Sequence, residues 1–140
     1  MNELLLIEFF TSQANIKNLK EKQIFTEALN LANRISIDLV HNSNLKRLII
    51  IRNQNLKKVL DKKIFYYETN PKKTMFNIVD KFSSKIPTIL IAPESDRIAI
   101  KLAEYLGRKT KLLNSSFNST RIFSSKSLTV NELIKKIFPV

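Results

Sequence analysis

The sequence contains no cysteine and no tryptophan, and it has one glycine and one histidine in 140 residues. Without cysteine the chain has no disulfide, no thiolate zinc site and no cysteine nucleophile, and His41 alone cannot form a multi-histidine metal site. Gly107 alone cannot supply a glycine-rich phosphate loop, because such loops need several residues free to adopt positive φ. A serine hydrolase would need His41 as its base and a glycine-flanked nucleophile turn, which the sequence lacks. The composition therefore argues against redox, zinc, serine-hydrolase and glycine-loop nucleotide enzymes.

Long apolar runs are also absent. The longest unbroken ones are about four residues, as in Leu4–Ile7 and Leu48–Ile51, far below the ~18 needed to span a bilayer. Met1, Asn2 and Glu3 lack the basic region that begins a secretory signal. We therefore expect a soluble, cytoplasmic chain without a membrane partner.

The fractions of hydrophobic and charged residues are those of a single folded domain. With 44% hydrophobic and 26% charged residues, the chain can bury one core of its own, and a second core is not expected. A net charge of +12 would ordinarily indicate nucleic acid or an anionic membrane as a partner. However, lysine, isoleucine and asparagine dominate the sequence, as in proteins from AT-rich genomes, and no long basic tract occurs. Aromatic and basic residues are interleaved only around Lys63–Tyr67, so nucleic acid is not the first partner that we expect.

The spacing of apolar residues predicts strands that alternate with helices. From Ile24 to Leu39 apolar side chains recur as one helical stripe, whereas Leu4–Phe10 and Leu45–Arg52 are apolar runs typical of strands buried on both faces. Along the whole chain, the same spacing rules predict strands at residues 4–10, 45–52, 63–68, 87–92 and 110–113, helices at 21–41, 71–85, 95–107 and 129–138, and single helical turns within 53–62 and 121–124.

Local signals predict where these helices begin and end. Pro71 needs no amide partner in a first helical turn, Ser95 is a good N-cap, and Gly107 lies where a C-terminal glycine is expected. His41, at the end of the first helix, is suited to the negative end of the helix dipole. The connection 53–62 is short for a crossover helix, so the direction of the third strand stays open.

This pattern predicts an α/β fold with a mostly parallel sheet of about four or five strands, covered by helices on both faces. In such sheets ligands bind beyond the carboxyl ends of the strands. The polar segments expected at that edge are Glu8–Gln13, Asn53–Asn55, Ala92–Asp96 and Asn114–Ser116.

Acidic residues at this edge are the main candidates for a binding site. Glu94 and Asp96 flank Ser95 at the start of a helix, where they either face the cleft or serve an ordinary helix cap. Glu8 interrupts an apolar strand, and a buried, unpaired carboxylate is costly. Glu8 should therefore point into the cleft, pair with a lysine or arginine, or lie solvated at the edge.

Several segments follow one another in a distinctive order: Leu4–Phe10, Ile89–Asp96, Leu112–Ser116, Ser125–Lys126 and Ile137–Val140. This order resembles the N-terminal part of ATP-grasp ligases, in particular the subgroup that contains tyramine–glutamate ligase. In that family an Ala-Pro-Glu-Ser/Thr-Asp strand end precedes a helix, a Leu-Leu-x-Ser strand follows, and an Asp-Lys helix leads into the ATP-binding lobes. The chain departs from the pattern at Thr11–Gln13, where the family tends to have glycines, and at Ser125, where it has aspartate.

The resemblance implies a three-layer, Rossmann-like preATP-grasp domain at residues 1–125. It implies that residues 126–140 form a helix leading toward ATP-grasp lobes, which this sequence lacks and which would act in cis or in trans. Complete ligases of this family use ATP and Mg²⁺ to activate a carboxylate as an acyl phosphate, which an amine then attacks. By the same resemblance the 140 residues alone need no cofactor and are not catalytic.

The resemblance also implies roles for individual residues. Glu8, Glu94, Ser95 and Asp96 would bind a small amino or carboxylate substrate, and Lys126 would reach the nucleotide phosphate in the complete enzyme. The alternative functions are a basic nucleic-acid-binding module and a regulatory interaction module, and a homodimer is left open.

Overall fold

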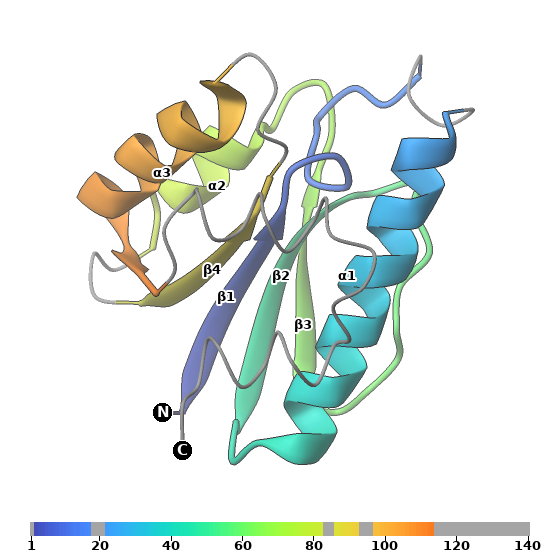
Figure 1. Cartoon of the computed structure of the whole chain (residues 1–140), viewed down its shortest axis with the longest axis vertical. Coiled ribbons are helices and arrows are strands. Elements are labelled where there is room, and N and C mark those ends of the chain that lie inside the picture. Colours follow the sequence, from blue (N-terminus) through green and yellow to red (C-terminus); the bar gives the residue numbers. More distant parts are fainter. Residues whose placement is uncertain (1, 18–21, 83–85, 93–96, 114–140) are drawn as a thin grey trace.

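The computed structural model describes residues 2–17, 22–82, 86–92 and 97–113, where strands and helices alternate (Figure 1). The elements are β1 (Glu3–Glu8), α1 (Gln23–Asn42), β2 (Arg47–Asn53), β3 (Ile64–Thr69), α2 (Met75–Val79), β4 (Pro87–Ile91), α3 (Ile98–Lys109) and β5 (Lys111–Leu112). The expected helix at 129–138 and the turn at 121–124 lie outside the described residues, as do Glu94, Ser95, Asp96 and Lys126.

The described strands form one parallel, five-stranded sheet in the order β3-β2-β1-β4-β5. α1 covers one face of this sheet, and α2 and α3 lie on the other face (Figure 1). The predicted α/β class is therefore confirmed, and the architecture is a three-layer Rossmann-like fold. The third strand, whose direction the sequence left open, runs parallel to β2 with Ile64 opposite Leu48. Because the chain winds outward from β1 in both directions, the strand order reverses between β1 and β4.

Alternate residues of the central strands face two different cores. Leu4 and Leu6 of β1 belong to the core beneath α1, whereas Leu5 and Ile7 belong to the core beneath α2 and α3. All four side chains are fully buried. Burial on both faces explains why these strands are continuous apolar runs without a polar alternation.

α1 confirms the long helix predicted at residues 21–41. It buries the stripe that contains Ala28, Ala32, Ile35 and Leu39. His41 lies in its last turn, with Nε2 3.8 Å from a carboxylate oxygen of Asp61. Neither α1 nor any other helix within the described ranges is both long and apolar enough to cross a bilayer.

β2 and β3 are joined by residues 54–63 without a helix. Parallel neighbours usually require a connection of about a dozen residues or more that contains one. The predicted helical turn here is only a hydrogen-bonded turn, in which the Leu56 amide donates to the Asn53 carbonyl oxygen at 3.2 Å. The connection runs on the α1 side of the sheet, where Val59 packs against the core, as a right-handed crossover requires (Figure 1).

α2 is shorter than the helix predicted at residues 71–85. Pro71 lies in a turn that precedes the helix, so the prediction that it begins the helix is wrong. Thr74 is the N-cap instead. Its hydroxyl accepts a hydrogen bond from the Asn77 amide at 3.3 Å, and the Asn77 side-chain oxygen accepts one from the Thr74 amide at 3.0 Å. This reciprocal capping box satisfies two backbone amides at the start of the helix.

α3 continues past Gly107, so the prediction of Gly107 as a C-terminal glycine is also wrong. The residue does not adopt a positive φ. Thr110 ends the helix: its amide and its hydroxyl donate to the Leu106 carbonyl oxygen at 2.7 and 3.0 Å. The hydroxyl thus gives a second hydrogen bond to a carbonyl oxygen in the last turn of the helix.

Candidate functional site

The carboxyl end of β1 turns into a loop that the Glu8 side chain organises. Glu8 is the last residue of β1 and is 1% exposed. One carboxylate oxygen accepts a hydrogen bond from the Thr11 amide at 2.7 Å, and the other accepts one from the Phe10 amide at 3.0 Å. The Ser12 amide donates to the Glu8 carbonyl oxygen at 3.1 Å and closes a tight turn. The direct partners of Glu8 are therefore backbone amides of its own loop, and within the described part of the chain neither solvent nor a lysine or arginine takes that place.

The charge state of Glu8 is set by opposing effects. Burial raises the pKa of Glu8, because the carboxylate loses its hydration. The hydrogen bonds from Thr11 and Phe10 and the positive charge of Arg52 act in the opposite direction. Arg52 is near Glu8 because the preceding residues of the two strands, Ile7 of β1 and Ile51 of β2, lie opposite each other in the sheet.

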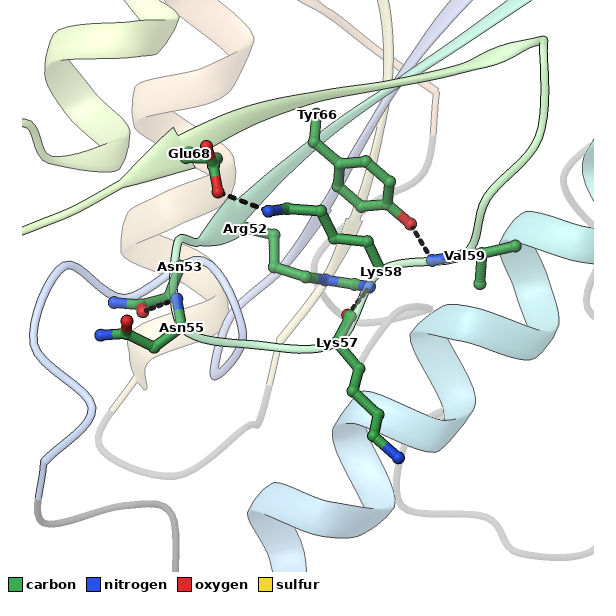
Figure 2. Close-up of polar contacts among 8 residues, drawn as sticks. All are labelled: Arg52, Asn53, Asn55, Lys57, Lys58, Val59, Tyr66 and Glu68. Atoms are coloured by element: carbon green, nitrogen blue, oxygen red, sulfur yellow. Dashed lines mark hydrogen bonds and ion pairs between the residues drawn. The ribbon is translucent and has the colours of Figure 1, made fainter.

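Arg52 is a buried cation near the carboxyl end of β2 (Figure 2). Its Nη1 donates to the side-chain oxygen of Asn33 in α1 at 2.6 Å and to the Lys57 carbonyl oxygen at 2.9 Å. The guanidinium carbon lies 5.2 Å from the centre of the Tyr66 ring in β3. Among the described residues, its Nε and Nη2 have no hydrogen-bond partner. Arg52 thus links α1, the β2–β3 connection and β3 through one side chain.

Burial lowers the pKa of the Arg52 guanidinium, because the charged form is removed from water. Interactions with Tyr66 and Glu8 raise it again. A planar guanidinium, with five donors and a flat face for an aromatic ring, suits this buried position better than a lysine ammonium would.

Two more contacts hold residues 54–63 against β3 (Figure 2). Lys58 Nζ lies 2.5 Å from a carboxylate oxygen of Glu68, and both side chains are partly exposed. The Val59 amide donates to the Tyr66 hydroxyl oxygen at 2.8 Å. Side-chain contacts therefore take over the role that a crossover helix has in most parallel units.

Asn53 and Thr69 fasten the loop after β1 to the ends of β2 and β3. The Asn53 side-chain amide donates to the carbonyl oxygens of Gln13 at 2.9 Å and Ala14 at 3.1 Å. The Thr69 hydroxyl donates to the same Gln13 oxygen at 3.1 Å, and the Asn53 backbone amide donates to the Thr11 carbonyl oxygen at 2.7 Å. Both anchoring side chains are buried. Hydrogen bonds therefore hold the loop after β1 against the carboxyl ends of β2 and β3.

The same edge continues across the boundary between β1 and β4. The Phe9 amide donates to the Ile91 carbonyl oxygen at 2.8 Å, and Glu8 lies opposite Ile91 in the register. The segment Ala92–Asp96 therefore begins beside the loop that follows Glu8, as the parallel arrangement predicted. Ala92 is fully buried, and residues 93–96 lie outside the described part of the chain.

Arg52 and Thr69 were not among the site residues predicted from the sequence. The sequence does contain a signal for Arg52, because this charged residue follows the apolar run Leu48–Ile51 just as Glu8 follows the apolar run Leu4–Ile7. The same cost of burying a charge that made Glu8 unusual applies to it. For Thr69 no local signal exists, since its role depends on the register of β3 against β2.

The described part of this edge suits binding better than proton transfer. The carboxylate of Glu8 is engaged by two amides, and His41 lies at the opposite end of α1 from the loop after β1. Within the described ranges, no three His, Cys, Asp or Glu side chains are grouped so that they could hold a metal ion. Comparisons of the chain with protein-family models, with curated proteins and with solved structures found no match.

Proposed function

We propose that this chain is the substrate-side domain of an ATP-grasp carboxylate–amine ligase and forms one wall of the substrate cleft. The observation that carries the proposal is the hydrogen bond from the Phe9 amide to the Ile91 carbonyl oxygen, at 2.8 Å. It joins the first residue after β1 to the last residue of β4 at the point where the strand order reverses, where doubly wound sheets bind ligands. The resemblance of Ile89–Asp96 to the corresponding segment of that family is the second support.

The proposal gives the residues of this edge different roles. Glu94, Ser95 and Asp96 bind the amino group of the acceptor. Glu8 acts as a positioning residue, because both of its carboxylate oxygens already accept hydrogen bonds from its own loop. Lys126 contacts a nucleotide phosphate in the complete enzyme, as a point charge suited to that group.

The proposal places ATP and Mg²⁺ outside the described part of the edge. The buried carboxylate there is engaged by backbone amides, and the described residues offer no cluster of three metal-ligating side chains. We therefore assign both to ATP-grasp lobes that act in cis or in trans and that supply the acyl-phosphate chemistry. This chain is assigned the binding and orientation of the substrate.

The proposal is tested by titrating the isotope-labelled chain with a panel of primary amines and amino acids, including tyramine and L-glutamate. We expect saturable shifts of the backbone amide signals of Phe9, Phe10, Thr11 and Ala92. The double variant Glu94→Gln/Asp96→Asn should bind at least about tenfold more weakly, since a hydrogen bond to a charged group contributes about 1.5–3 kcal/mol. The matched control is Glu104→Gln, which removes an exposed carboxylate from α3 and should bind like the parent.

Two results would contradict the proposal. One is the absence of shifts at these amides with every compound of the panel. The other is ATP turnover by the purified 140-residue chain that Lys126→Ala abolishes, because the nucleotide chemistry would then reside in this chain.

A further inference from the structure

One side of β3 carries exposed aromatic rings that none of the described helices covers. Phe65 and Tyr67 are 45% and 37% exposed, although large aromatic side chains are mostly buried in folded proteins. Because side chains alternate along a strand, these two rings share one face, whereas Tyr66 between them points to the core beneath α1. That shared face is the one on which α2 and α3 lie.

The short α2 explains this exposure. A helix of five residues is about 7.5 Å long, whereas a strand of six residues extends about 20 Å. α2 follows the carboxyl end of β3 after a turn, and Phe82, three residues beyond the end of α2, places its ring centre 5.1 Å from that of Tyr67. α2 does not extend as far as Phe65, which lies near the amino end of the strand.

Cations surround the two rings. The guanidinium carbon of Arg47 lies 4.1 Å from the centre of the Phe65 ring, and β2 carries it on the same face. Lys73 and Lys81 line a hollow of about 130 Å³ beside Tyr67. Among the described residues, none of these three cations forms an ion pair with a carboxylate. We call Arg47, Phe65, Tyr67, Lys73 and Lys81 the aromatic–cationic face.

We propose that the aromatic–cationic face binds single-stranded nucleic acid. Residues two apart on one side of a strand are about 6.8 Å apart, twice the ~3.4 Å rise between stacked nucleotides, so Phe65 and Tyr67 can each receive one base. Sheet-borne aromatic side chains stack bases in other single-strand binders, and cations beside them contact the phosphates. The net charge of +12 favours this polyanion electrostatically over a neutral or cationic partner.

This proposal is independent of the ligase proposal. It uses the outer face of β3, whereas the substrate cleft would use the loops after β1 and β4. None of the variants that test one proposal changes a residue assigned to the other, so either can fail alone.

The test measures the binding of a fluorescent oligothymidylate of about 15 nucleotides by anisotropy, at salt concentrations from about 50 to 200 mM. Three phosphate contacts predict a slope of about −2 in the plot of log K against log salt, which is a loss of roughly 20-fold over that range. Phe65→Ala and Tyr67→Ala should each weaken binding by roughly 5- to 150-fold. Lys73→Gln and Lys81→Gln should each make the salt slope shallower by about 0.7.

Matched controls separate this face from general surface effects. Phe76→Ala removes an aromatic ring that is also 45% exposed but that packs edge-to-face on Tyr105 of α3. Lys101→Gln removes one charge from α3. Both controls should bind the oligonucleotide like the parent, and a urea denaturation curve of each variant verifies that it is folded.

Several outcomes would overturn the proposal. One is that the chain does not bind the oligonucleotide at the lowest salt concentration. Another is that it binds a duplex of the same length with equal affinity. A third is that Phe76→Ala and Phe65→Ala lose equal amounts of affinity. Binding to vesicles of anionic phospholipid without binding to the oligonucleotide would also overturn it, because a membrane surface would then be the partner.

Discussion

Replacing Arg52 tests how the helix-free connection between β2 and β3 is held. Arg52→Ala removes the hydrogen bonds to the Asn33 side chain, at 2.6 Å, and to the Lys57 carbonyl oxygen, at 2.9 Å. Each bond from a charged donor contributes about 1.5–3 kcal/mol, and the truncation also leaves a cavity under the Tyr66 ring. We expect the free energy of unfolding to fall by about 3–5 kcal/mol, which is two such bonds at the low end of their range plus the cost of the cavity.

Arg52→Met separates the contribution of charge from that of packing. Methionine fills much of the same volume without a buried charge, and two nitrogens of Arg52 have no partner among the described residues. Both variants lose the desolvation cost of these nitrogens, but only methionine fills the cavity that alanine leaves, so Arg52→Met should be at least about 1 kcal/mol more stable than Arg52→Ala. Urea denaturation monitored by circular dichroism measures both differences.

Arg34→Ala is the matched control, since Arg34 is exposed on α1 and its loss should change stability by no more than about 0.5 kcal/mol. An Arg52→Ala chain that unfolds within about 1 kcal/mol of the parent would refute the role assigned to Arg52. An Arg52→Met chain no more stable than Arg52→Ala would refute it equally, because packing and charge would then have been apportioned wrongly.

Three further predictions concern single side chains. Burial raises the pKa of Glu8 above its usual 4.5 in the folded chain, so its contribution to stability is full below the unfolded pKa and is lost as the pH rises through the folded pKa. Urea denaturation across that pH range should show this decline in the parent but not in Glu8→Gln. Gly107→Ala should raise the free energy of unfolding by about 0.5–1 kcal/mol, because Gly107 is helical and a β-carbon there meets no atom within 4 Å; an unchanged or lowered denaturation midpoint would contradict this. Tyr66→Phe should cost about 0.5–1.5 kcal/mol by leaving the Val59 amide without its acceptor, whereas Tyr67→Phe should leave the midpoint unchanged.

The sheet could be predicted from sequence because its strands are buried on both faces. Leu4–Ile7 and Leu48–Ile51 supply side chains to two cores at once, and only a parallel sheet between helix layers gives such runs a place. The long stripe of α1 was equally informative. In both cases the signal is a periodicity that local residues carry by themselves.

The parts that could not be predicted depend on tertiary contacts. Residues 54–63 have no helical periodicity, and β3 is parallel to β2 because Arg52, Lys58 and Tyr66 hold the connection in place. The length of α2 depended on the choice between Pro71 and Thr74 as its start, which the capping box decided. At the candidate site, Glu8 was identified as unusual, but its partners are amides of a loop whose conformation no pattern predicts.

β3 connects the two proposed functions physically. It is the edge strand of the described sheet, so only β2 pairs with its backbone. On the side that faces α1, Tyr66 accepts from the Val59 amide and Glu68 pairs with Lys58, whereas Thr69, on the same side as Phe65 and Tyr67, anchors the loop after β1. The outward rings of Phe65 and Tyr67 are thereby presented from a fixed backbone, which lowers the entropy lost when a ligand orders them. One alternating strand can therefore hold the connection from β2 with one set of side chains, and with the other set anchor the loop at the carboxyl edge and offer a binding face.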